Sequence, residues 1–329
     1  MKEKVGVFAE SRELSKARPG KTGKKKLRAW YKNWQLYLLA LPALAVIAVF
    51  CYAPMYGIII AFKDYNVIQG IGGSPWADPI FKHFKAFVTD SYFLNMLWNT
   101  LRLSLCSLLV FPLPILFALL LNEIRIKSLR TTVQIISYAP YFISLVVSVS
   151  MCFTFLEYTQ DRVGIINRII MFFGLEPVKF MESAAWFPWI YVLSGLWQGL
   201  GWWSITYVAA LTAIDPTLYE AAEIDGASRL RKIWHINIPS LMPIISITLI
   251  MNLGNMLNVG FEKVLLMQTD LNYASSNIIS TYVYEKTLGS VIKQYSYGTA
   301  IGLFNNVISL VLLLGANFIA KKLGGETIL

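Results

Sequence analysis

The chain has 329 residues, of which 56% are hydrophobic and only 15% charged, and its mean hydropathy is +0.54. Soluble domains carry about 25% charged residues. The composition therefore excludes a water-soluble globular protein and indicates a polytopic membrane protein. The net charge of +10 does not point to nucleic acid, because much of it is concentrated at one end of the chain.

That end is a basic tail over residues 1–34. It holds eleven of the 29 Lys and Arg residues, including "KTGKKKLR", and an uncharged run follows directly. A basic segment before a first span is typical of a cytoplasmic flank, and binding to lipid headgroups is the secondary interpretation. We expect this tail to be disordered, and we expect no secretory signal peptide, because no small-residue cleavage site follows a short apolar core.

Six charge-free runs are long enough to cross a bilayer, which takes about 20 apolar residues. They cover residues 36–62, 103–121, 132–156, 183–214, 238–261 and 294–320. The sequence therefore predicts an all-α integral membrane protein with six transmembrane helices in one domain, residues 35–325. Kinks are expected at the prolines inside these runs, since neighbouring helices can satisfy the freed backbone groups: Pro42, Pro54, Pro112, Pro114, Pro140 and Pro188.

The distribution of Lys and Arg predicts the orientation, because cytoplasmic segments carry the excess. With the tail inside, the inner segments hold 19 of these residues and the three outer segments, 63–93, 157–182 and 262–293, hold 9. Arg102 is placed at an outer helix end. Both termini are then cytoplasmic, and the segment around residues 215–238 is cytoplasmic too.

Catalytic and metal sites are not expected. "SKARPGKT" at residues 15–22 ends like a phosphate-binding loop but lacks the first glycine and the preceding strand. His83 and His235 are far apart and have no neighbouring Cys or second His. No Ser, His and Asp spacing supports a nucleophile, and no soluble domain could hold the paired carboxylates of a glycosidase. We expect neither a catalytic residue nor a cofactor in this chain.

The segment "DPTLYEAAEIDGASRLRKIWHINIPSLMP" stands out between two apolar runs. Asp215 and Pro216 form a helix start, with an N-cap side chain before the one position where proline costs nothing. Good helix formers follow, and Gly226 then breaks the helix, because glycine readily takes positive φ. A second short helix is predicted after it, and Pro239 is expected to start the next span. The pattern indicates a rigid helix–turn–helix that protrudes from the membrane, although an ordinary amphipathic loop is the plainer interpretation.

The order Glu-Ala-Ala, Asp-Gly-Ala and Ile-x-Ile-Pro in this segment resembles the EAA motif of binding-protein-dependent (MetI-like) ABC importer permeases, with Ile238 in place of the usual Leu. Longer stretches are similar to the polysaccharide-type, LplB-like members of that family: "YAPMYGIIIAFKDYN", "WQGLGWWSITYVAAL", "NLGNMLNVGFEKVLLM", "STYVYEK" and "YSYGTAIGLFNNVISLVLLLGANFIAKKL". The likeness covers residues 30–325 and implies the type I importer permease fold.

The resemblance implies a subunit of an ATP-driven importer for oligosaccharides or polysaccharide fragments in the bacterial cell membrane. It implies a second, homologous permease, an ABC ATPase dimer that holds the ATP and Mg, and an extracellular lipid-anchored binding protein. The segment 215–238 would contain a coupling helix that docks on the ATPase. The residues expected at this docking surface are Tyr219, Glu220, Ala221, Ala222, Asp225, Gly226, Ala227 and Arg229.

A sugar path needs aromatic platforms for ring faces and amides for hydroxyl groups. The fourth, fifth and sixth runs offer such residues: Trp197, Gln198, Trp202, Trp203, Tyr207, Asn252, Asn255, Asn258, Asn305 and Asn306. Asn in spans also bonds helices together, and Trp near span ends also forms the interfacial belt, so both interpretations stay open. The alternative function is a stand-alone secondary carrier, which would favour ionisable residues inside spans; the six runs have none.

Overall fold

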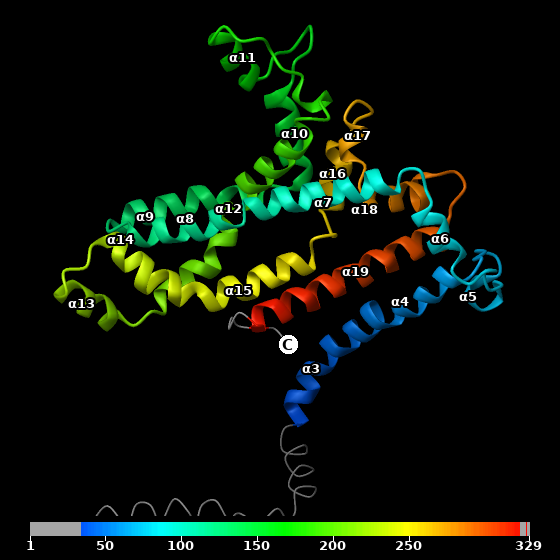
Figure 1. The fold of residues 1–329 in the computed structure, drawn as a ribbon, viewed down its shortest axis with the longest axis horizontal. Coiled ribbons are helices and arrows are strands. Elements are labelled where there is room, and N and C mark those ends of the chain that lie inside the picture. The colour runs from blue at the N-terminus through cyan, green and yellow to red at the C-terminus, as the bar shows by residue number, and fades with distance from the viewer. Residues whose placement is uncertain (1–33, 323–326, 328–329) are drawn as a thin grey trace, which may run out of the picture. The chain divides into compact units, whose positions relative to one another are not determined.

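The structure, a computed structural model, describes residues 34–322 and 327, and Figure 1 shows its fold. In these ranges every regular element is a helix, and the extended pairings are two isolated bridges, Lys63–Trp76 and Tyr158–Val163. The prediction of an all-α protein is confirmed. The basic tail, residues 1–33, lies outside the described residues.

The first of two compact units ends at Ile58. It holds helix α3, a π-helical turn over Ala48–Tyr52 and helix α4. Pro54 follows the π-helical turn, where its missing N–H interrupts the regular α-helical hydrogen bonding. The apolar helix that begins at Trp34 continues as a 3-10 helix to Phe62. The bounds are α3 Trp34–Ile47 and α4 Ala53–Met55.

The second unit covers residues 59–329 and contains the other helices. Their bounds are α5 Gly70–Gly73, α6 Lys82–Val88, α7 Phe93–Leu109, α8 Pro112–Glu123, α9 Lys127–Tyr138, α10 Leu145–Leu156, α11 Ile165–Phe172, α12 Phe187–Thr212, α13 Pro216–Ile224, α14 Arg229–Lys232, α15 Ile238–Gly254, α16 Phe261–Met267, α17 Tyr273–Ser276, α18 Ile279–Tyr284 and α19 Tyr295–Lys322.

Helix α12 is the centre of this unit. It packs against α7, α8, α9 and α15, and α15 packs in turn along α19 (Figure 1). Three clusters of buried apolar side chains hold the helices together, centred on Phe187, on Phe87 and on Leu241. In lipid such packing, rather than the hydrophobic effect, holds helices side by side.

Within residues 34–322, four helices are long and apolar enough to cross a membrane: Trp34–Phe62, Phe93–Glu123, Arg229–Gly254 and Tyr295–Lys322. A fifth arises if Lys127–Phe142 and Leu145–Leu156 are taken as one span, bent by 100°. The bend follows Pro140, where a kink was predicted. The fourth run forms the 26-residue helix α12, which is long enough but carries many Trp, Gly and Ser residues that lower its apolarity.

Several predicted boundaries are wrong. The second run is helical from Phe93, so Arg102 lies within α7 and not at a helix end. Pro188 begins α12 and does not kink it. Pro239 stands in the first turn of α15, as predicted, but α15 is not separate from the segment before it, because the helix is continuous from Arg229 to Gly254. A π-helical turn over Ile233–Asn237 precedes this proline, where its missing N–H interrupts the regular α-helical hydrogen bonding.

Candidate functional site

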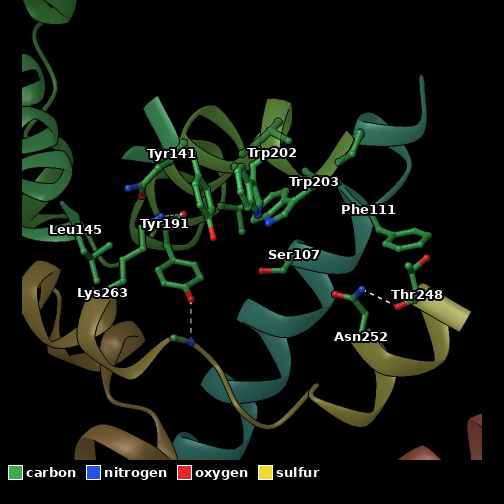
Figure 2. A pocket seen from close by; sticks show the side chains of 18 of the residues that line it. Ser107, Phe111, Tyr141, Leu145, Tyr191, Trp202, Trp203, Thr248, Asn252 and Lys263 are labelled. Carbon is green, nitrogen blue, oxygen red and sulfur yellow. Dashed lines mark hydrogen bonds between the residues drawn. The ribbon is translucent and has the colours of Figure 1, made fainter. Parts of the chain in front are cut away.

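A cavity of about 1010 Å³ lies beside the middle of α12 and is also lined by α7, α8, α15 and α16. Figure 2 shows it with aromatic side chains on one side and amide and hydroxyl groups on another. The lining residues with polar or aromatic side chains are Ser107, Phe111, Tyr141, Tyr191, Gln198, Trp202, Trp203, Thr206, Tyr207, Thr248, Asn252, Asn258, Phe261, Glu262 and Lys263.

The aromatic side of the cavity is a stacked pair. The rings of Tyr141 and Trp202 are parallel within 4°, with centroids 4.3 Å apart. Gly201 makes this stack possible, because a Cβ added there would lie 2.3 Å from the backbone oxygen of Ser137. The missing side chain lets α12 approach the end of α9 closely enough for Trp202 to reach Tyr141. Flat aromatic surfaces of this kind suit the apolar face of a ring.

The polar side is formed by α15. Asn252 donates from Nδ2 to the backbone oxygen of Thr248 at 2.8 Å, which leaves its Oδ1 as an acceptor toward the cavity (Figure 2). The Thr248 hydroxyl is 3.0 Å from the hydroxyl of Tyr207. These groups can exchange hydrogen bonds with the hydroxyls of a bound solute.

A single basic side chain completes the lining. Lys263 is only 8% exposed, and its Nζ donates to the backbone oxygen of Tyr191 at 2.7 Å. The ammonium also lies 4.8 Å from the centre of the Tyr191 ring, a cation–π geometry. Lys263 belongs to the short helix α16, outside the candidate spans. Burial lowers its pKa to about 8, because removal from water disfavours the charged form; most of it remains protonated at neutral pH.

Some of the residues predicted for a sugar path line the cavity, and others do not. Gln198, Trp202, Trp203, Tyr207, Asn252 and Asn258 line the cavity, and Asn255 lines a smaller adjoining hollow of about 200 Å³. Asn305 is buried and donates to Oδ1 of Asn258 at 3.0 Å. Trp197 and Asn306 are exposed and line neither space. The side-chain amide of Gln198 donates a hydrogen bond to the backbone oxygen of Ile143.

The three asparagines from the fifth run do not all lie on one helix. Helix α15 ends at Gly254, so Asn258 lies in the connection to α16. Sequence reasoning missed Tyr141, Tyr191 and Lys263, which come from three separate segments. Their signal was weak, because Tyr141 and Tyr191 are ordinary residues inside predicted spans and Lys263 follows the end of one. Only tertiary packing brings the three together.

The segment 215–238 forms the predicted helix, glycine turn and second helix. Asp215 caps α13 by accepting from the backbone N–H of Thr217 at 2.9 Å. Gly226 has φ of +69°, and Ala227 N donates to the backbone oxygen of Ala222 while Gly226 N donates to that of Glu223. This pair of bonds is the Schellman arrangement that ends helices at a left-handed glycine.

Two side-chain contacts tie α13 to the rest of the segment. Tyr219 donates to Oδ1 of Asn237 at 2.6 Å, and Lys232 Nζ is 2.6 Å from Oε1 of Glu223. The hydrogen bond and charge of Lys232 lower the pKa of Glu223, so this carboxylate is charged at neutral pH. One contact thus joins α13 to the residue before α15, and the other joins it to the end of α14.

The outer surface of this segment is available to a partner. Glu220, Ala221, Asp225, Gly226 and Arg229 are exposed, whereas Tyr219, Ala222 and Ala227 are half-buried. The structure adds large apolar side chains that the motif did not identify, with Ile224 87% exposed: Leu218, Ile224, Leu230 and Trp234. Apolar side chains gathered on an otherwise polar surface are typical of an interaction site.

Comparison with protein families gives one matching family model over residues 110–325: the binding-protein-dependent transport system inner membrane component. Among curated proteins of Bacillus subtilis (strain 168), the polygalacturonan/rhamnogalacturonan transport system permease protein YteP is 45% identical over 89% of this chain and 89% of its own length. Protein LplB of the same organism is 42% identical, over 88% of this chain and 90% of its own.

Two solved structures are similar across most of the chain. One is a bacterial ABC transporter involved in the import of the acidic polysaccharide alginate, with TM-score 0.80, 37% identity and coverage of 91% of this chain and 99% of that chain. The other is a bacterial alginate ABC transporter in complex with alginate pentasaccharide-bound periplasmic protein, with TM-score 0.81, 36% identity and coverage of 92% and 99%.

Proposed function

The chain belongs to the family of binding-protein-dependent transport system inner membrane components, and on that premise we propose that it carries carbohydrate oligomers through the cavity beside α12. It is a permease subunit of an ABC importer in the bacterial cell membrane, a transport component and not an enzyme. Family membership also excludes the stand-alone carrier considered from the sequence.

The observation that carries the proposal is the chemistry of the cavity. The stacked Tyr141 and Trp202 offer a flat aromatic surface, and Asn252 and Thr248 face the same space with polar groups. Sugars present apolar ring faces and a rim of hydroxyls, which such a lining can contact together. The volume of about 1010 Å³ is large for a single small molecule. The relatives named for polygalacturonan, rhamnogalacturonan and alginate transport agree with a carbohydrate oligomer.

Transport would couple the cavity to ATP through the segment 215–238. We infer that α13 docks on an ABC ATPase, which holds the ATP and Mg, and that Tyr219 and Glu223 pass its displacement to α15. Because α15 lines the cavity with Thr248 and Asn252, its movement would open the cavity alternately to each side of the membrane. The residues proposed to face the ATPase are Glu220, Ala221, Ala222, Asp225, Gly226, Ala227 and Arg229 with Tyr219.

The finer topology is part of the same proposal. Six spans result if α12 crosses the membrane together with the four apolar helices and the bent pair. Both termini are then cytoplasmic, as the excess of Lys and Arg on that side favours. A second permease would complete the pathway, and an extracellular lipid-anchored binding protein would deliver the solute.

The test is ATP-dependent uptake by the complete transporter, with its second permease, ATPase and binding protein, in proteoliposomes. Radiolabelled galacturonate trimers and neutral galactose trimers serve as probes. We expect uptake of at least one carbohydrate oligomer that requires ATP. Failure of both probes and of other carbohydrate oligomers, in a preparation whose ATPase responds to its binding protein, would overturn the proposed carbohydrate function.

A further inference from the structure

The ammonium of Lys263 is a buried positive charge at the wall of the cavity without a carboxylate partner. Among the described residues, no Asp or Glu oxygen lies within 4.0 Å of its Nζ. Its hydrogen bond goes to a neutral backbone oxygen, that of Tyr191. Lys residues are almost never this deeply buried unless they are paired. The ammonium of Lys263 is therefore placed to bind an anion that enters the cavity.

The cavity wall is shaped around this group. A Cβ on Gly195 would lie 3.0 Å from Nζ, so the glycine leaves the space that the ammonium occupies. The ring of Tyr191 lies on another side at 4.8 Å, and its hydroxyl accepts from Gly260 N at 3.1 Å, which holds the segment before Lys263 in place. Figure 2 shows Lys263 and Asn252 on opposite sides of the cavity.

The other titratable groups near the lysine do not neutralise it. Cys152 is the one titratable side chain with an electrostatic effect on Lys263, and it is a thiol and not a carboxylate. Glu262 lines the same cavity but is exposed and forms no ion pair with its neighbour. A charge held in a partly dehydrated wall gains most from an anion that can also accept its remaining N–H groups, which a carboxylate does.

We propose that Lys263 is a specificity-determining residue that binds a carboxylate of the solute, and that the importer therefore favours uronate-containing over neutral oligosaccharides. This inference rests on the proposed function, since it requires that the solute enters the cavity. The aromatic stack at Tyr141 and Trp202 would hold sugar rings, and Lys263 would select those that carry a negative charge.

The test measures binding of the solute to the permease itself, so that the selectivity of the binding protein does not contribute to the result. The permease–ATPase complex, without binding protein, is titrated with an α-1,4-linked galacturonate trimer and with its carboxyl-reduced, neutral counterpart, and binding is followed by fluorescence of the tryptophans. We expect the uronate to bind about tenfold more tightly, as one charge-assisted hydrogen bond allows. Lys263→Met should remove that preference and leave binding of the neutral trimer within about twofold.

Two further variants serve as controls. Lys263→Arg keeps the charge and should retain the preference, and Lys179→Met removes an exposed lysine paired with Glu182 and should change neither affinity. Equal binding of the two trimers by the wild type, or a preference that persists in Lys263→Met, would overturn the inference and leave the proposed function intact. If neither trimer binds the complex although the complete transporter imports them, the cavity assignment itself fails.

Discussion

The hydroxyl of Tyr219 donates a hydrogen bond of 2.6 Å to Oδ1 of Asn237, and this bond joins α13 to the residue that precedes α15. Asn237 is fully buried. Burial and the charge of Glu123 raise the pKa of Tyr219, so its hydroxyl keeps its proton and acts as the donor at neutral pH. The exposed helix proposed to meet the ATPase is thus fixed to a helix that lines the cavity.

Replacement of Tyr219 by Phe should therefore weaken coupling without removing the ATPase. The change leaves a buried amide oxygen without its partner, at a cost of about 1–3 kcal/mol, and lets α13 move independently of α15. We expect the solute taken up per ATP hydrolysed to fall severalfold while the ATPase still copurifies. Tyr52→Phe, which removes the same hydroxyl from an exposed side chain, is the control. An unchanged uptake-to-hydrolysis ratio in Tyr219→Phe would show that this bond does not transmit the movement.

Gly226 should be required for its backbone conformation and not for its small size. No atom of the described residues lies within 4 Å of a Cβ added there, but φ is +69°, where residues other than Gly, Asn and Asp are strained by about 1–2 kcal/mol. Gly226→Val should remodel the turn and reduce copurification of the ATPase, with membrane insertion unchanged. Gly226→Asn tolerates this conformation and should retain most of it. Equal loss in both variants would instead indicate that the docking partner leaves no room for a side chain.

The local structure of the segment 215–238 was predictable from sequence because its signals are local. An N-cap Asp, a Pro at the first helical position and a glycine turn act within a few residues, and the structure has each of them at the predicted place. Pro239 was correctly placed in the first turn of α15, but the sequence did not reveal that a π-helical turn before it keeps the helix continuous from Arg229.

The cavity was predictable only in part. Trp202 and Asn252 were identified by residue type, but Tyr141 and Lys263 reach the same space through long-range packing that depends on Gly201 and Gly195. Nothing local distinguishes Lys263 from the other basic residues of the outer segments. Its burial is a property of the assembled helices, so the charge at the cavity wall could be found only in the structure.

Gly201→Ala should disturb the aromatic side of the cavity. The added Cβ would meet the backbone oxygen of Ser137, which cannot move as a flexible side chain can, so α12 must shift and carry Trp202 away from Tyr141. Overpacking of this kind costs about 1–3 kcal/mol. We expect a lower thermal unfolding temperature and severalfold weaker oligosaccharide binding. Gly302→Ala is the matched control, because within the described part of the chain nothing lies within 4 Å of a Cβ added there. Normal binding by Gly201→Ala would show that the aromatic stack does not contribute to solute recognition.

Asp90 should make stability depend on pH. It joins the loop before α7 to α18 and α19, because its Oδ2 accepts from the hydroxyls of Tyr282 at 2.6 Å and Tyr297 at 3.0 Å. Partial burial alone would raise its pKa, but hydrogen bonds from Tyr282, the Tyr92 N–H and Tyr297 together lower the pKa below its ordinary value of 3.8. The folded state therefore holds this proton less tightly than the unfolded state. The stabilisation from the Asp90 carboxylate is complete above the ordinary pKa of 3.8 and is lost as pH falls through the lowered pKa of the folded state.

The measurement is the thermal unfolding temperature of the wild type and Asp90→Asn in detergent, between pH 7 and pH 3. At pH 7 we expect the variant to be less stable by about 1 kcal/mol, because a neutral amide oxygen accepts more weakly from two tyrosine hydroxyls than a carboxylate does. The difference should shrink toward pH 3 as the wild-type carboxylate becomes protonated. A difference that stays constant across this range would assign the loss to altered packing, since every other titrating group is common to the two proteins and Asp90 alone distinguishes them.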